Sequence, residues 1–129
     1  MATISAVVRP VSGTATAVGS SGGHCVVVDR PDGTAGGAGL GFNGGQLLAL
    51  AIAGCLANDL RYAAADPEDP HLDAVRVTAD VDVVDGRVVG ARVRFEGGGA
   101  VAELVRAAVA DSTVLAAVRA GFPVEVVDA

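Results

Sequence analysis

Two cysteines are the side chains with the clearest capacity for covalent chemistry. Cys55 lies within an apolar run, residues 47–57, and Asp59 follows it one helical turn later. Apolar surroundings suit a buried thiol, and a carboxylate one turn away disfavours its thiolate form. The local sequence therefore favours an unreactive core cysteine, because a reactive thiolate needs a cation from another segment. Cys25 follows His24, but neighbours on a strand point to opposite faces, which predicts a small strand residue there.

Metal and nucleotide chemistry have weaker support. The histidines, cysteines and carboxylates show no metal-ligand spacing, so we expect no metal site. Residues 39–44 spell GxGxxG before a helix, but a dinucleotide fingerprint follows its strand directly and has an acid about 20 residues further on, at the end of a second strand. Here the strand ends at Asp29, and the nearest acid lies inside the helix. The glycine-rich segment, residues 33–45, is interpreted as a flexible loop, and no cofactor is predicted.

The elements that position Cys55 follow from hydrophobic periodicity. Before the glycine-rich segment, short β-branched runs separated by Ser/Gly clusters predict three strands, at residues 4–8, 14–18 and 25–28. After it, residues 46–65 contain no proline and repeat apolar residues at helical spacing. This pattern predicts a long helix, which residues 66–70 end.

A hairpin follows the helix. Residues 75–83 and 89–95 alternate apolar and mainly polar side chains, which predicts two half-buried strands joined by a turn. Pairing their apolar faces places Val81 opposite Ala91 and Val77 opposite Phe95.

The outer face of this hairpin supports the same register. It pairs Asp80 with Arg92 and Arg76 with Glu96, so both pairs are opposite in charge. The register also requires an odd loop, residues 85–87, with a bulge beside Gly86.

The last third of the chain predicts two short helices and a strand. Residues 100–110 carry an apolar stripe that we expect to cover the sheet, and Asp111 or Ser112 caps a second helix that stops at Gly121. Residues 122–127 read as a closing strand. The element order is that of an α+β protein, and residues 1–129 are predicted to form a single domain.

Composition excludes several classes of partner. The net charge is −6, and all nine cations are arginines, which argues against nucleic acid or an anionic membrane. The longest apolar run is too short to span a bilayer, and the first ten residues lack a signal-peptide pattern. With only two cysteines, the expected compartment is a reducing cytoplasm. Alanine and valine supply 48 residues and aromatics only 3%, so the core is thin and we expect a partner subunit.

The segment Gly-Phe-Asn-Gly-Gly-Gln-Leu-Leu-Ala-Leu-Ala-Ile-Ala-Gly-Cys, residues 41–55, resembles the active-site helix of the OsmC/Ohr family of bacterial thiol peroxidases. The resemblance implies an OsmC-like fold over nearly the whole chain, with antiparallel sheets wrapped around a long central helix in an intertwined homodimer. It also implies a role in the oxidative stress response.

The resemblance assigns roles to positions. Cys55 matches the cysteine that attacks an organic hydroperoxide, and the resolving cysteine of the family falls near Asp111 or Ser112. The family's loop proline falls on Gly44, and the glutamate of its hydroperoxide-resistance branch falls on Gly45. In the wider family the acidic position falls on Gln46, and the catalytic arginine falls near residues 13–14, where this chain has none.

Two functions are therefore predicted as alternatives. In the first, Cys55 reduces organic hydroperoxides and an external thiol serves as the reductant. In the second, a catalytically degenerate protein binds a small apolar ligand at the dimer interface, and a purely structural role is the remaining interpretation. The predicted substrate-binding residues share the Cys55 helix or the loop before it: Asn43, Gln46, Leu48, Ala51, Ile52 and Tyr62.

Overall fold

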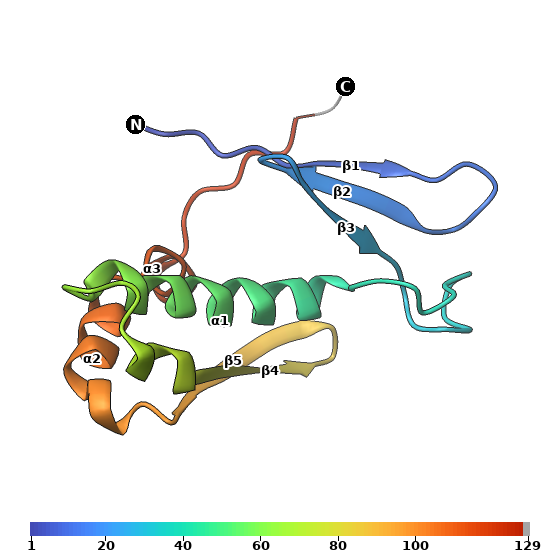
Figure 1. Cartoon of the computed structure of the whole chain (residues 1–129). Helices are drawn as coiled ribbons and strands as arrows, with labels where there is room; N and C mark the ends of the chain where they lie inside the picture. The colour runs from blue at the N-terminus through green and yellow to red at the C-terminus, as the bar shows by residue number, and fades with distance from the viewer. Residues whose placement is uncertain (128–129) are drawn as a thin grey trace. The chain divides into compact units, whose positions relative to one another are not determined.

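The computed structural model describes residues 1–127 and has mixed α and β elements with antiparallel pairing (Figure 1). Internal contacts divide the chain into two compact units, Met1–Leu47 and a second that begins at Leu48. This confirms the α+β class. The single-domain organisation stays a prediction, and each unit is described by itself.

The first unit contains a three-stranded antiparallel sheet in the order β1 (Val7–Pro10), β2 (Ala17–Ser21), β3 (His24–Val28). The predicted meander is therefore confirmed, although β1 and β2 begin three residues later than expected. β2 and β3 are joined at Gly22 and Gly23, whose φ angles of 57° and 82° suit a turn that follows the twist of paired strands.

The glycine-rich loop after β3 is organised around one buried carboxylate, that of Asp29. Its oxygens accept hydrogen bonds from the backbone amides of Arg30 at 2.8 Å and of Ala38 and Leu40 at 3.1 Å each. Further along, the Phe42 amide donates to the Val27 carbonyl oxygen at 2.9 Å. The loop thus returns to β3 in a conformation held by hydrogen bonds.

Asp29→Asn should loosen this loop, because an amide replaces one acceptor oxygen with a donor that faces backbone N–H groups. The amide of Leu40 foremost, helped by those of Arg30 and Ala38, lowers the pKa of Asp29 although burial opposes the shift. A lowered pKa means that the stabilisation is complete above the unfolded value, about 3.9, and is lost as pH falls through the folded value. Hydrogen exchange at the Ala38 and Leu40 amides should accelerate in the variant, and unchanged exchange would contradict this account. The exposed Asp32→Asn is the control.

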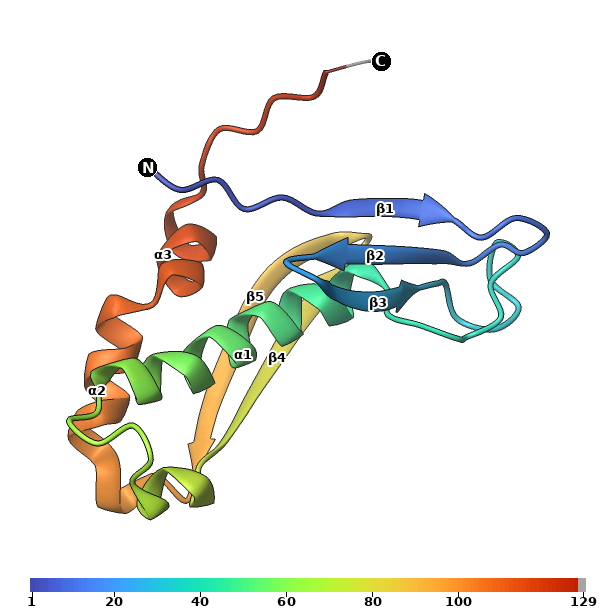
Figure 2. The same cartoon turned by 45° about the horizontal axis from the view of Figure 1, so that its top comes forward.

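Helix α1 (Gly44–Ala63) leads into the second unit, and a single-turn helix η1 (Pro70–Ala74) follows it. The hairpin is formed by β4 (Arg76–Val84) and β5 (Arg87–Glu96). Next come a short turn η2 (Gly99–Val101), α2 (Ala102–Asp111) and α3 (Thr113–Ala120). Figure 2 shows the hairpin running alongside α1.

Two apolar clusters hold the second unit together. In one, Ile52 and Leu56 of α1 pack with Leu115 of α3 and with the inner face of the hairpin. In the other, Leu60 packs with residues of η1, η2 and α2, and with Val77 and Phe95 of the hairpin. The predicted contact between the 100–110 helix stripe and the sheet is thereby confirmed.

The four predicted pairs of the hairpin register are confirmed: Val81 faces Ala91, Val77 faces Phe95, Asp80 faces Arg92 and Arg76 faces Glu96. The predicted loop was wrong. The turn has two residues, Asp85 and Gly86, with φ angles of 50° and 74°, as in the mirror-image turns that match strand twist. The extra residue is instead Val89, because Asp82 pairs with Gly90 while Val83 pairs with Val88.

The outer-face ion pairs follow the predicted register only in part. Arg76 binds Glu96 directly at 2.7 Å, but Arg94 reaches Asp80 at 2.6 Å and Arg92 reaches Asp82 at 2.8 Å. Arginine is long enough to contact the diagonal neighbour two residues along the partner strand, so it does not need the residue directly opposite.

The C-terminal helices match the sequence, but the final strand does not. Ser112 is the N-cap of α3, and Gly121, with φ 71°, ends that helix. The strand predicted at residues 122–127 was wrong, since this segment is irregular and exposed. Its alternation has the right period for a strand, but a strand also requires a hydrogen-bonded neighbour, and none pairs with it within residues 1–127.

Candidate functional site

Cys55 lies half-buried on α1, between two polar side chains. Its Sγ is 3.4 Å from Oδ2 of Asp59, one helical turn later, and 3.6 Å from Oγ of Ser112. Asp59 shares the helix, whereas Ser112 comes from a segment 57 residues away in sequence. The contact between Cys55 and Ser112 is therefore a product of tertiary packing.

The position of Ser112 has a simple local cause. It separates α2 from α3 with an extended backbone, ψ 121°, and its buried Oγ accepts a hydrogen bond from the Leu115 amide at 3.2 Å. Leu115 in turn packs on Ile52 and Leu56 of α1. The N-terminus of α3 is thus held against the helix that carries Cys55.

The charge beside Cys55 is negative. Among the described residues its hydrogen-bond partners are a carboxylate and a hydroxyl, and neither is a cation. Arg61 lies later on α1, but its guanidinium donates to the Pro67 carbonyl oxygen at 2.7 Å and to Asp73 at 3.0 Å. In this arrangement the thiol donates to Asp59 and accepts from Ser112.

The six predicted binding residues lie in three places: a cavity, an exposed flank of α1, and the start of α1. Leu48 and Ile52 line a cavity of about 530 Å³ between α1, the hairpin, α2 and α3. Ala51 and Tyr62 are exposed. Ala51 lies four residues before Cys55 and Tyr62 seven residues after it, so both share the flank of α1 that carries Cys55. Cys55 is not among the residues that line the cavity.

Asn43 and Gln46 form a reciprocal cap at the start of α1. The Gln46 amide donates to Oδ1 of Asn43 at 2.9 Å, and the Asn43 amide donates to Oε1 of Gln46 at 3.0 Å. This capping box satisfies two backbone N–H groups at the start of the helix. The sequence signal for this cap was an asparagine followed three residues later by a glutamine. The prediction that Asn43 and Gln46 bind substrate did not take that signal into account.

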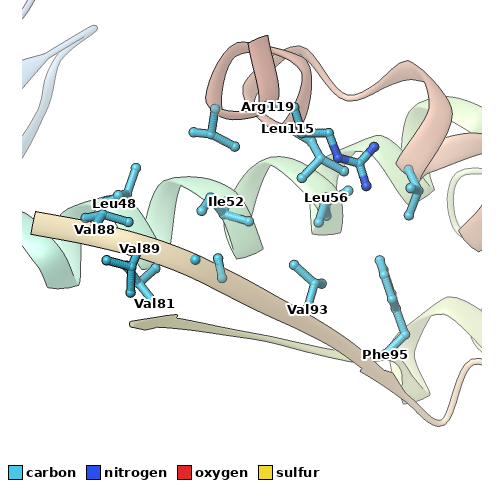
Figure 3. A pocket seen from close by; sticks show the side chains of 14 residues that line it. Leu48, Ile52, Leu56, Val81, Val88, Val89, Val93, Phe95, Leu115 and Arg119 are labelled. Atoms are coloured by element: carbon cyan, nitrogen blue, oxygen red, sulfur yellow. The ribbon is translucent and has the colours of Figure 1, made fainter. Parts of the chain in front are cut away.

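The cavity is apolar apart from one charged side chain. In Figure 3, Leu48, Ile52 and Leu56 of α1 lie across from Val81, Val89, Val93 and Phe95 of the hairpin, with Leu115 and Arg119 contributed by α3. Such a lining can accept a small apolar molecule. Sequence reasoning missed Arg119, because nothing in the short helix distinguishes it from a solvated surface arginine.

Cys25 is exposed on β3 and faces Ser20 of β2 in the sheet register. Its predicted place on a strand is confirmed. Arg9 of β1 and Cys25 both line a shallow depression of this sheet.

Within residues 1–127, no group of three or more histidine, cysteine, aspartate or glutamate side chains is placed to hold a metal ion. None of the helices in this range combines the length and apolar character needed to cross a membrane. No protein-family model matches the sequence, and a search of the curated proteins found no match.

The distance between Cys55 and Ser112 predicts that Ser112→Cys, in a Cys25→Ser background, forms an intramolecular disulfide when treated with a mild thiol oxidant. The side-chain atoms are already 3.6 Å apart, so the bond requires only a small adjustment. Intact mass should show the loss of two hydrogens, reversed by dithiothreitol. Thr113→Cys, at the exposed next position, is the matched control and should stay reduced. Equal behaviour of the two variants would contradict the placement of Ser112.

Proposed function

We propose that this protein is a divergent OsmC/Ohr-like thiol peroxidase in which Cys55 reduces organic hydroperoxides and an external thiol is the reductant. One observation carries the proposal. The resemblance assigns the attacking cysteine to Cys55 and the resolving position to the neighbourhood of Asp111 and Ser112. Ser112 lies in contact with Cys55 although 57 residues separate them. This is the proximity that a pair of attacking and resolving residues requires.

The chemistry balances without a resolving cysteine. The Cys55 thiolate attacks the terminal oxygen of ROOH and the O–O bond breaks. Cys55 becomes a sulfenic acid and the alkoxide takes a proton to leave as ROH. An external thiol then displaces water from the sulfenic acid to give a mixed disulfide, and a second thiol releases Cys55 in its reduced form. Because Ser112 has no thiol, the reductant must come from solution.

The proposal includes an intertwined homodimer with an OsmC-like fold, located in the cytoplasm. The flank of α1 that carries Cys55 also carries exposed Ala51 and Tyr62, and Tyr62 is 86% exposed. A second subunit on this flank would enclose Cys55 and could supply the cation that the described contacts of Cys55 lack.

Stoichiometric cumene hydroperoxide should add one oxygen atom to Cys55 in the folded protein. Intact mass and peptide mapping measure this, with trapping of the sulfenic acid by a dimedone reagent. Cys55→Ser should abolish the addition, and Cys25→Ser should leave it unchanged. Oxidation is expected to be slower than it would be without the carboxylate of Asp59 beside the sulfur. Turnover should depend on added thiol. A Cys55 that oxidises only after unfolding, or no faster than free cysteine, would refute the peroxidase proposal.

Binding of a small apolar ligand is the second candidate function, and the cavity of about 530 Å³ favours it. Its walls come from several elements of one unit, and this candidate requires no ionised cysteine.

Ala91→Phe should weaken the binding of an apolar fluorescent probe, N-phenylnaphthylamine, several-fold. Ala91 lines the cavity on the inner face of β5 and is exposed, so the larger ring occludes the space at small cost to packing. The matched control is Arg92→Phe, which places the same ring on the outer face of the hairpin. Equal probe affinity in the two variants would exclude this cavity as the binding site.

A further inference from the structure

We infer that Ser112 is a positioning residue for Cys55, whose hydroxyl donates a hydrogen bond to Sγ and holds the sulfur for reaction. The inference rests on the proposed function, in which Cys55 is the attacking group. Ser112 stands near the position where the resemblance would have the resolving cysteine, and the inference gives it a role in the chemistry of Cys55.

Within residues 1–127, the hydroxyl of Ser112 has one acceptor to which it can donate, the sulfur of Cys55. The side chain is 2% exposed, so bulk solvent does not compete for its proton. The Leu115 amide donates to Oγ at 3.2 Å and occupies one of its lone pairs. The remaining polar neighbour is Sγ of Cys55 at 3.6 Å, within the range for a hydrogen bond to sulfur. A hydroxyl carries one proton, and that proton is therefore directed at the sulfur.

The bond to Leu115 also makes Ser112 a better donor. An N–H group that donates to Oγ polarises the hydroxyl, and hydrogen bonds in series strengthen one another. This series of hydrogen bonds runs from the Leu115 amide in the first turn of α3, through the hydroxyl of Ser112, to the sulfur of Cys55. When Cys55 ionises, the bond from Ser112 becomes charge-assisted, so it favours the thiolate over the thiol.

Asp59 acts in the opposite sense. Its Oδ2 is 3.4 Å from Sγ and accepts a hydrogen bond only while the sulfur keeps its proton. The other charged groups on the elements around Cys55 lie on all three helices. They are Arg61 on α1, bound to Asp73, then Glu103 and Arg106 on α2, paired with each other, Asp111 at the exposed end of α2, and Arg119 in the last turn of α3, at the cavity. The contacts on the sulfur thus come from one group that favours ionisation, Ser112, and one that opposes it, Asp59.

The pH profile of Cys55 alkylation by iodoacetamide tests this role, measured on the folded protein in a Cys25→Ser background. Ser112→Gly removes the hydroxyl, and glycine is among the residues that helix N-caps tolerate. We expect the half-maximal rate to move to higher pH and the rate at pH 7 to fall several-fold. Ser112→Thr keeps both the cap and the donor and should restore the parent profile. Asp59→Asn should move the profile to lower pH.

A second variant guards against loss of folding. Ser112→Asp retains a strong N-cap but has no proton to donate at neutral pH and adds a carboxylate beside the sulfur, so the profile should move to higher pH by more than in Ser112→Gly. Far-UV circular dichroism confirms that each variant is folded. If folded Ser112→Gly and Ser112→Asp both keep the parent profile, Ser112 is only a helix cap and the inference is overturned.

The measurement separates this inference from the proposed function. Alkylation uses no hydroperoxide, so a shifted profile supports the role of Ser112 even when cumene hydroperoxide leaves Cys55 unmodified. That combination would refute the peroxidase reaction alone. Rapid oxidation of Cys55 with an alkylation profile unaffected by Ser112 would refute the positioning role alone.

Discussion

The second unit depends on one stripe of leucine and isoleucine along α1. Ile52, Leu56 and Leu60 recur every four residues and are the buried side chains of that helix, and Leu56 is completely inaccessible. Burial of each such side chain contributes about 1.5–3 kcal/mol, which makes this stripe the main anchor for the hairpin and for α3. Cys55 directly precedes Leu56. Its rotation about the helix axis is set by the stripe, and it is left at the edge of the core, half-buried and still within reach of reagents.

The same stripe explains why a polar contact forms at Cys55. Leu115 must reach Ile52 and Leu56, so the first turn of α3 is brought against α1. The residue that caps this turn, Ser112, is then buried beside the sulfur. A buried hydroxyl without a partner is costly, and Cys55 together with the Leu115 amide satisfies it. One hydroxyl thus serves helix α3 as an acceptor and Cys55 as a donor, so stability and thiol chemistry are coupled at this position.

The sequence was most informative where a pattern has only one physical solution. The hairpin register followed from apolar alternation, because a slip of one residue would turn Val77 and Val81, the valines of β4 that pack on the core, towards solvent. The position of the bulge did not follow, since an odd loop and an extra residue at Val89 satisfy the same parity. The strand expected at residues 122–127 failed for a related reason: alternation describes one chain segment, whereas a strand is defined by its neighbour. Cys55 could be singled out from sequence, but its contact with Ser112 depends on how three helices pack.

Some predicted binding residues already use their polar groups to stabilise a helix, which limits their capacity to bind a ligand. Asn43 and Gln46 use their side-chain oxygens on each other's backbone amides, so a ligand would have to compete with the start of α1 for these groups. Leu48 and Ile52 face the cavity, whereas Cys55 lies on a neighbouring flank with Ala51 and Tyr62. The two candidate functions therefore use different sides of one helix. Ligand binding depends on the space between α1 and the hairpin, and thiol chemistry depends on the junction of α2 and α3. The two sites nevertheless share one support, because Ile52, Leu56 and Leu115 line the cavity and also hold the first turn of α3 against α1 beside Cys55.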